Sequence, residues 1–235
     1  EVILMYTKKR TATSEAVYQK LKEQILHLEL PPGSVISEID TAAKYEISRT
    51  PVRDAFKMLE TEGLLEIRPH VGTFVSLIDL NMISDILYMR EVLEQSVFKD
   101  LASSYDRSQA FRIRLILQRQ RELLDTDLSA DELGRAFIIS DNEFHDALYE
   151  LAGKKNVMNF LKSINSQYER FRTFLNLGDR NNLLNLYGDH MTIWEYIAEG
   201  DYDKLANSIS HHIYDGFNSS TEIVYKHPEY FKSIR

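Results

Sequence analysis

Residues 47–57 read Ile47-Ser48-Arg49-Thr50-Pro51-Val52-Arg53-Asp54-Ala55-Phe56-Lys57 and carry two distinct faces of one helix. The apolar residues that share one face are Val52, Ala55, Phe56 and Leu59. The basic residues that recur every four positions on another face are Arg49, Arg53 and Lys57. Apolar residues at this spacing predict an amphipathic helix that packs through one side. The other side of the helix then presents arginine to solvent close to its N-terminus.

The flanking segments predict what surrounds this helix. In chain order we expect a helix over 14–28, a short helix from Ser37, a third helix from Ser48 to Gly63, and strands over 64–68 and 73–76. Pro31-Pro32-Gly33 ends the first helix, and Pro69-His70-Val71-Gly72 forms a tight turn between the strands. Helix, helix, turn, helix and hairpin in this order form a winged helix-turn-helix.

A basic face on the third helix suits the major groove of DNA. Arginine there can donate two hydrogen bonds to one guanine, which discriminates between bases by about 1–3 kcal/mol. Nearby hydroxyls and the wing can reach phosphate and sugar. The candidate DNA-binding residues are Ser48, Arg49, Thr50, Arg53, Lys57, Arg68, His70 and Gly72. A basic stripe by itself is more often a solvated helix face, but the neighbouring helix, turn and wing favour DNA.

Composition narrows the class of protein. The 235 residues are 43% hydrophobic and 27% charged, with nine Gly, five Pro and no Cys. These values exclude a disordered tail, a disulfide scaffold, a cysteine nucleophile and a thiolate metal site. No apolar run approaches the roughly 20 residues of a membrane helix. We therefore expect a cytoplasmic protein that does not associate with a membrane.

Charge and helical pattern divide the chain in two. Residues 1–76 hold 10 Lys and Arg against 11 Asp and Glu, whereas residues 77–235 hold 18 against 25. After residue 76, helical patterns follow over 79–104, 108–125, 130–152, 155–177, 181–199 and 202–222. We predict a mainly α protein. Its parts are a winged helix-turn-helix of three helices and a two-stranded wing over 8–76, a linker at 77–79, and an all-α six-helix ligand-binding and dimerisation domain over 80–226.

The N-terminal motifs resemble those of the GntR family of bacterial transcription regulators. The matching segments are Pro32-Gly33, Glu38, 47–55, 59–65 and 72–75. The resemblance covers residues 14–76 and implies operator contacts from Arg49, Thr50 and Arg53, with Gly72 at the wing tip. Asp54 and Phe56 stand where Glu and Leu are more usual, and neither change touches an expected base contact. Ile39 and Asp40 supply no basic residue where some relatives have an operator-contacting Arg, so the second helix is assigned no DNA role.

Four residues of the later helices are candidate ligands of one metal ion: Asp141, His145, His190 and His212. Asp141 and His145 are four positions apart, so their side chains leave one helix in the same direction. Three imidazoles and a carboxylate suit Zn, Ni or another divalent transition ion and leave room for an oxygen ligand. His211 competes with His212 for the last position. On spacing alone, a hydrogen-bonded core histidine is the commoner case.

The helical region resembles the FCD ligand-binding domain of the FadR branch of that family. The matching segments are 90–94, 141–145, Ala152-Gly153 with Asn156, and His190 with 197–201. The resemblance implies that the Asp and three His ligate a metal, and six helices are similar to the shorter VanR-type subgroup. A metal with open positions attracts a carboxylate, which Arg90 would clamp and Asn156 would help enclose. Lesser candidates, for which a surface or interhelical salt bridge is favoured, are Arg135, Arg170 and Arg172.

Together these features predict a ligand-responsive transcription regulator. We expect a homodimer on a two-fold symmetric operator in double-stranded DNA, because one recognition helix reads only a few base pairs. A small carboxylate or sugar acid would control operator affinity, with repression as the default sign. One alternative is a metal sensor in which the ion itself is the signal. A less favoured one is a metal-dependent enzyme fused to a DNA-binding module, since the sequence has no HExxH motif, nucleophile elbow or phosphate-binding loop.

Overall fold

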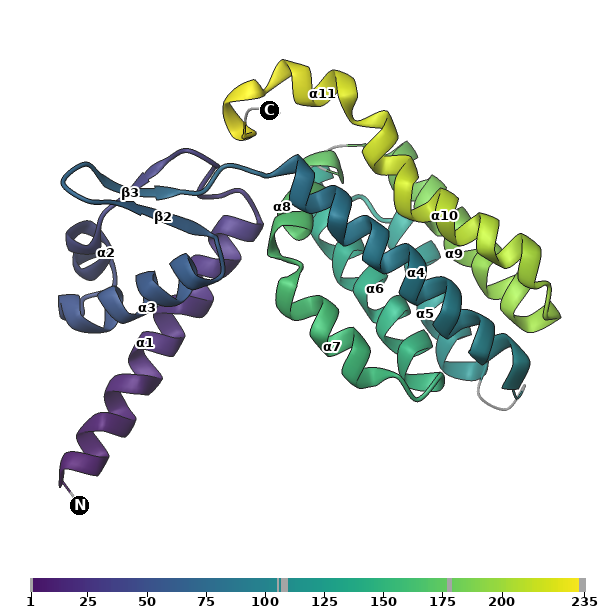
Figure 1. Cartoon of the computed structure of the whole chain (residues 1–235), viewed down its shortest axis with the longest axis horizontal. Helices are drawn as coiled ribbons and strands as arrows, with labels where there is room; N and C mark the ends of the chain where they lie inside the picture. Colours follow the sequence, from purple (N-terminus) through teal and green to yellow (C-terminus); the bar gives the residue numbers. More distant parts are fainter. Residues whose placement is uncertain (1, 105, 107–109, 177–178, 233–235) are drawn as a thin grey trace. The chain divides into compact units, whose positions relative to one another are not determined.

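The computed structural model describes residues 2–104, 106, 110–176 and 179–232 of the chain. The chain divides into two compact units, Glu1–Leu80 with His227–Arg235 and Asn81–Lys226. The first unit contains three helices and a small sheet, and the second is helical in its described residues (Figure 1).

Three helices build the N-terminal unit: α1 (Val2–Leu26), α2 (Glu38–Lys44) and α3 (Arg49–Thr61). The hydroxyl of Ser37 accepts hydrogen bonds from the second and third N–H groups of α2, so Ser37 is the N-cap of the short helix that the sequence predicts from this residue. Ser48 lies at the N-cap of α3, but its side chain makes no capping hydrogen bond. The sequence predicts this first helix over 14–28, whereas α1 begins at Val2 and ends at Leu26. The helix ends before Leu28 because Leu28 has a left-handed φ of 59°, which is not a helical conformation.

Three short antiparallel strands form the wing: β1 (Val35–Ile36), β2 (Leu65–Arg68) and β3 (Gly72–Val75). The spatial order is β1-β3-β2, with Leu65 opposite Val75 and Val35 opposite Phe74. β2 and β3 form the predicted hairpin. The sequence pattern does not predict β1, because a strand of two residues is too short to show the alternation of apolar and polar residues. Gly72 enters β3 with a φ of +150°, a conformation that a Cβ disfavours, so the turn needs glycine there.

One apolar core holds the N-terminal unit together. Helices α1 and α3 pack against each other and, with the sheet, bury Val17, Leu21, Ile25, Val52, Ala55, Phe56, Leu59, Leu64 and Val75. The four apolar residues predicted for one face of α3 are among them and are fully buried. Because that face is inside, the basic face of α3 is the one left in solvent.

Eight helices are described in the second unit. They are α4 (Leu80–Ser104), α5 (Ala110–Leu124), α6 (Ala130–Leu151), α7 (Lys155–Ile164), α8 (Ser166–Asn176), α9 (Arg180–Glu199), α10 (Tyr202–Ser219) and α11 (Thr221–Lys226). The sequence predicts six, because single-residue breaks at Asn165 and Ser220 leave the apolar spacing intact. At Asn165 the N–H bonds back three residues, to Lys162, while its carbonyl already accepts from Glu169 in the next helix. The resemblance to the shorter subgroup, which rested on a count of six, loses that support.

Helix α6 is central to the second unit. It packs against α5, α7, α8 and α9, and α9 also packs against α5 and α10 (Figure 1). A capping box between Ser129 and Glu132 starts it, and the buried residues of its second half include Asp141 and His145. These two polar side chains therefore lie inside the bundle and not on its surface. Within the described part of the chain, no helix has the length and apolarity needed to cross a membrane.

The segment after α11 belongs to the N-terminal unit. Pro228–Tyr230 forms a 3-10 turn, and Phe231 then pairs with Ile78 in a parallel β-bridge in which both side chains are buried. The Ile78 N–H donates to the carbonyl of Tyr230 at 2.8 Å, and the Lys232 N–H donates to the carbonyl of Ile78 at 2.9 Å. The stretch predicted as a linker, 77–79, is thus hydrogen-bonded to the C-terminal segment of the chain.

Candidate functional site

The predicted DNA-binding residues lie on the surface of the N-terminal unit. Those that are exposed are Ser48, Arg49, Thr50, Arg53, Lys57, Arg68 and His70, and Gly72 is half-buried. Arg49 Nη2 lies 3.4 Å and Arg53 Nη2 lies 3.3 Å from the same Oε2 atom of Glu38 on α2. One carboxylate therefore holds the two leading arginines of α3 close together, a role that the sequence did not suggest for Glu38.

The wing holds its own basic side chain in place. The guanidinium of Arg68 lies 4.6 Å from the centre of the Phe74 ring and pairs with Glu66 at 2.9 Å. His70, in the turn beyond, has a left-handed φ of 62°. The turn thereby presents Arg68 and His70 at one end of the small sheet, and their contacts with DNA remain predictions.

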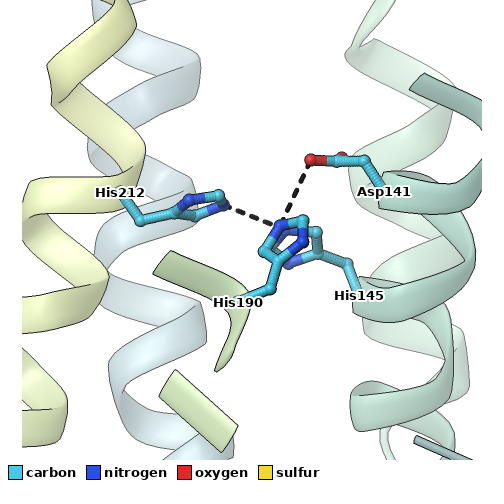
Figure 2. Close-up of side chains that lie close together, drawn as sticks. All are labelled: Asp141, His145, His190 and His212. Carbon is cyan, nitrogen blue, oxygen red and sulfur yellow. Dashed lines mark hydrogen bonds and ion pairs between the residues drawn. The ribbon is translucent and has the colours of Figure 1, made fainter. Parts of the chain in front are cut away.

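The interior of the second unit brings the four candidate metal ligands together. They are Asp141 and His145 on α6, His190 on α9 and His212 on α10 (Figure 2). All four are buried, and one ligand atom from each lies within 4.8 Å of the others. His145 Nε2 is 3.2 Å from His212 Nε2, and His190 Nε2 is 3.3 Å from Asp141 Oδ1. Bonds of about 2.0–2.2 Å to a common ion would set neighbouring ligand atoms roughly 3 Å apart, so these separations suit one ion.

The structure also distinguishes the two adjacent histidines of α10. The His211 side chain is 65% exposed and its Nε2 lies 4.0 Å from Asp189, whereas His212 lies in the cluster. The apolar spacing of α10 carries a usable signal, because Leu205 and Ile209 share the buried face with His212.

Each imidazole of the cluster has a second partner behind it. The Nδ1 atoms of His145, His190 and His212 lie 3.3 Å from Glu94 Oε2, 3.0 Å from Gln120 Oε1 and 3.4 Å from Asp189 Oδ2, respectively. An acceptor at Nδ1 favours a proton there and leaves the Nε2 lone pair directed at the centre. These three acceptors are absent from the predicted site. Gln120 could have been found, because it is the one polar residue in the buried stripe of α5, and Glu94 could have been found because it shares the mainly apolar buried stripe of α4 with Arg90.

The donor set fits a divalent transition ion. The buried Nε2 of His190 has no hydrogen-bond partner among the described residues, although it faces a carboxylate oxygen. Such an orphaned polar atom is costly unless a proton or a cation occupies the space beside it. Imidazole nitrogen and carboxylate oxygen are the ligands that Zn and Ni accept.

The charges of the cluster are already those that metal binding needs. Burial by itself would raise the pKa of Asp141, but Arg172, His190 and His145 hold that pKa well below its ordinary value. Burial opposes ionisation of Glu94 as well, yet Arg90 and His145 lower its pKa to about 2. The pKa of His190 is lowered to about 4, because the effect of burial is larger than the opposite effect of the neighbouring Asp141 carboxylate. At neutral pH both carboxylates are ionised and His190 is neutral and free to coordinate.

A cavity of about 50 Å³ lies beside the cluster, and its lining includes Arg90, Asp141, Tyr168, Arg172, Asp189 and His212. Arg90, the predicted clamp, pairs with Glu94 at 2.8 Å, and Arg172 pairs with Asp141 at 2.6 Å. The interhelical salt bridge favoured for Arg172 is therefore present, but its partner is the candidate metal ligand Asp141, and both residues line the cavity. Among the described lining residues, Arg135, Arg170 and Asn156 do not appear.

Fold and site together define a winged-helix DNA-binding protein with a helical C-terminal domain. The family model described as "Bacterial regulatory proteins, gntR family" matches residues 13–75, and the model of the FCD domain matches residues 85–215. The chain belongs to the GntR family, carries an FCD domain and is a DNA-binding transcriptional regulator.

Individual relatives agree with this assignment. A transcriptional regulator of the helix-turn-helix type in an unstable DNA locus of Streptomyces ambofaciens is 31% identical over 92% of this chain and 88% of its own length. The transcriptional repressor RspR of Escherichia coli (strain K12) is 24% identical over 93% of each chain. The crystal structure of a GntR regulator from Rhodococcus sp. RHA1 covers 89% of this chain and 97% of its own, with a TM-score of 0.70 and 20% identity, and so shares the fold. Family and relatives are regulators, in agreement with the expectation that this chain is not an enzyme.

Proposed function

We propose that this regulator is a cytoplasmic repressor whose operator affinity falls when a small organic acid binds at a metal centre in the FCD domain. The observation that carries the proposal is the convergence of three imidazole Nε2 atoms and Asp141 beside a cavity lined by two arginines. Repression as the sign of regulation is supported by the relative named as a repressor.

DNA recognition is assigned to α3 and the wing. Arg49, Thr50 and Arg53 would read base edges in the major groove, since they lie exposed at the start of α3. Ser48, Lys57 and the wing residues would contact phosphate and sugar. A single helix of this kind reads only a few base pairs, so useful specificity requires a homodimer on a two-fold symmetric operator.

The metal centre is assigned to Asp141, His145, His190 and His212, with Zn or Ni as the ion. The ion would supply a Lewis-acid position for an oxygen ligand. Asp141 faces two ways: its Oδ1 lies near His190 while its Oδ2 pairs with Arg172 at 2.6 Å. One carboxylate can therefore serve the metal and an arginine at the same time.

The cavity favours an anionic ligand of small size. The guanidinium carbons of Arg90 and Arg172 lie 5.1 and 5.6 Å from the centre of the Tyr168 ring, so two cations flank one aromatic side chain at the cavity. A carboxylate placed there gains charge-assisted hydrogen bonds. A volume of about 50 Å³ holds little more than such a group, so larger sugar acids would have to displace lining side chains.

Helix α4 connects this site with the DNA-binding unit along the chain. It begins at Leu80, directly after the 77–79 segment, and carries both Arg90 and Glu94. An acid that takes a share of Arg90 would disturb the contacts that Glu94 makes with Arg90 and His145. The acid alters operator affinity only if it binds one arrangement of the protein more tightly than the other.

The test is thermal unfolding of the full chain against a panel of small carboxylates and sugar acids, before chelation, after chelation and after Zn or Ni is restored. A ligand of the native state raises its stability by mass action. We expect metal to raise the Tm and one class of acid to raise it further only when metal is present. An acid that raises the Tm in this way is then added to the protein bound to a fluorescently labelled operator, which is first selected from random DNA. The fluorescence anisotropy of the operator should fall, because the acid releases the protein from the DNA. Acids that stabilise equally without metal would contradict the proposal.

The metal-sensor alternative has its own support, because the four ligands are assembled by the protein alone. It predicts that operator affinity follows Zn or Ni occupancy with no acid added. The variant His190→Ala should then abolish the response to metal, whereas His211→Ala, on the exposed face of α10, should not change it.

A further inference from the structure

Gln120 is a fully buried polar residue on α5, a helix that supplies none of the four candidate ligands. Its side-chain Nε2 donates a hydrogen bond to the carbonyl of Ser140 at 3.1 Å. Its Oε1 lies 3.0 Å from Nδ1 of His190. Ser140 directly precedes Asp141, so Gln120 connects the ligand-bearing part of α6 with the ligand on α9.

The Ser140 carbonyl determines which way the Gln120 amide points. A reversed amide would set the Gln120 oxygen against the Ser140 oxygen, and two acceptors would face each other without a proton between them. The amide nitrogen must therefore face Ser140 and the amide oxygen must face His190. Since that oxygen can only accept, His190 carries its proton on Nδ1.

A neutral imidazole has one ring proton, so a proton on Nδ1 leaves a lone pair on Nε2. That Nε2 lies 3.3 Å from Oδ1 of Asp141, and both atoms then offer electrons to the same space. With the opposite tautomer, Nε2 would instead donate to Asp141, and two candidate ligands would satisfy each other. The choice between a site open to a cation and a closed ion pair thus depends on the acceptor at Nδ1.

We propose that Gln120 is a positioning residue that holds His190 as an Nε2 ligand for the metal of the FCD domain. The inference deepens the proposed function and rests on its metal centre. It also gives a reason for an amide at position 120. The acceptors behind His145 and His212 are the carboxylates Glu94 and Asp189, and another buried charge would add a desolvation cost that an amide avoids.

The first test measures Zn affinity of the full chain by competition with a chromophoric chelator. Gln120→Leu removes the acceptor and keeps the volume similar, so we expect affinity to fall about 10–100-fold, the usual effect of losing such an outer partner. Gln120→Glu restores an oxygen that accepts from Nδ1 and should bind Zn at least tenfold more tightly than the Leu variant. The matched control is Gln118→Leu on the same helix, whose side chain is exposed and bonds only to Glu122 among the contacts given by the structure. It should leave Zn affinity unchanged.

The second test reads the tautomer directly, in metal-free protein labelled with ¹⁵N-histidine. Long-range ¹H–¹⁵N correlation should place the His190 proton on Nδ1 in the wild type and move it toward Nε2 in Gln120→Leu. A purely structural role of Gln120 would lower the Tm without changing the tautomer, and would overturn the inference. So would a wild-type His190 protonated on Nε2. A wild type that binds no Zn while His190 shows the Nδ1 proton would overturn the metal centre instead, so the two failures are distinguishable.

Discussion

Replacing Arg172 by methionine tests the electrostatic design of the candidate metal centre. Arg172 Nη2 lies 2.6 Å from Asp141 Oδ2, and the two side chains are only 10% and 5% exposed. Its other terminal nitrogen donates to Asn142 Oδ1 at 3.0 Å. Methionine keeps most of the side-chain length and apolar volume, so Arg172→Met removes the charge with little cavity formation. Asp141 is then left as a buried carboxylate without its guanidinium.

Breaking one partner of a buried ion pair costs about 3–5 kcal/mol, because the remaining charge is uncompensated. For a protein of this size, 1 kcal/mol corresponds to roughly 2–4 °C in Tm, so the metal-free variant should melt roughly 6–20 °C lower. A divalent cation near Asp141 would supply positive charge in place of Arg172. The loss should therefore be smaller when Zn is present than after chelation.

The measurement is calorimetric unfolding of wild type and variant, each with chelator and with excess Zn. The control is Arg112→Met, which breaks an ion pair with Glu150 whose side chains are 53% and 44% exposed. Such a surface pair contributes about 0–1 kcal/mol, so this variant should melt close to the wild type in both conditions. Equal effects of the two variants in chelator, or a loss for Arg172→Met that Zn does not reduce, would refute the reasoning.

Three further predictions concern other parts of the chain. Arg49→Ala should weaken operator binding by about 1–3 kcal/mol and relax base choice at one position, measured by fluorescence anisotropy; unchanged affinity would contradict the placement of α3 in the major groove. Phe231→Ala should release the C-terminal segment, so the amide protons of Ile78 and Lys232, which hydrogen-bond across that bridge, should exchange faster with solvent; unaltered protection would show that the ring does not hold the segment. In chelated protein, the free energy of unfolding should decrease as the pH is lowered from about 6.5 to about 4. In this range His190 binds a proton in the unfolded protein, but in the folded protein it stays neutral because its pKa is about 4. His190 alone should contribute a slope of up to about 1.4 kcal/mol per pH unit, and the total slope should be smaller by that contribution in His190→Ala.

Much of the N-terminal unit is predictable from the sequence because its signals are local. The apolar spacing of Val52, Ala55 and Phe56 assigns one face of α3 to the core, and the structure buries all three. Ser37 and the turn before Gly72 mark an N-cap and a hairpin through the hydrogen bonds and φ values that those residues favour. β1 escapes prediction because its two residues pair only through contact with β3, which lies far along the chain.

The candidate metal ligands are predictable as a set, but their surroundings are not. Spacing assigns Asp141 and His145 to one face of α6, the metal-binding chemistry of imidazole adds His190 and His212, and the resemblance to the FCD domain supports the whole set. The alternatives for Arg172 could not be separated, because a helix period says which way a side chain points and not which charge it meets. The same limit hides which imidazole Nδ1 atom each acceptor meets, because the acceptors come from three different helices.

By itself, the sequence determined the helix, helix, turn, helix and hairpin order of the N-terminal unit, the buried face of α3 and the residue types able to bind DNA or a metal. These properties follow from local periodicity, capping and side-chain chemistry, all of which act over a few residues. Only the tertiary structure decided that His212 meets His145 and His190, that Gln120 lies behind His190, and that Phe231 pairs with Ile78. These three contacts join residues that are far apart in the sequence. They depend on how whole helices and distant segments pack, which local periodicity and capping do not specify.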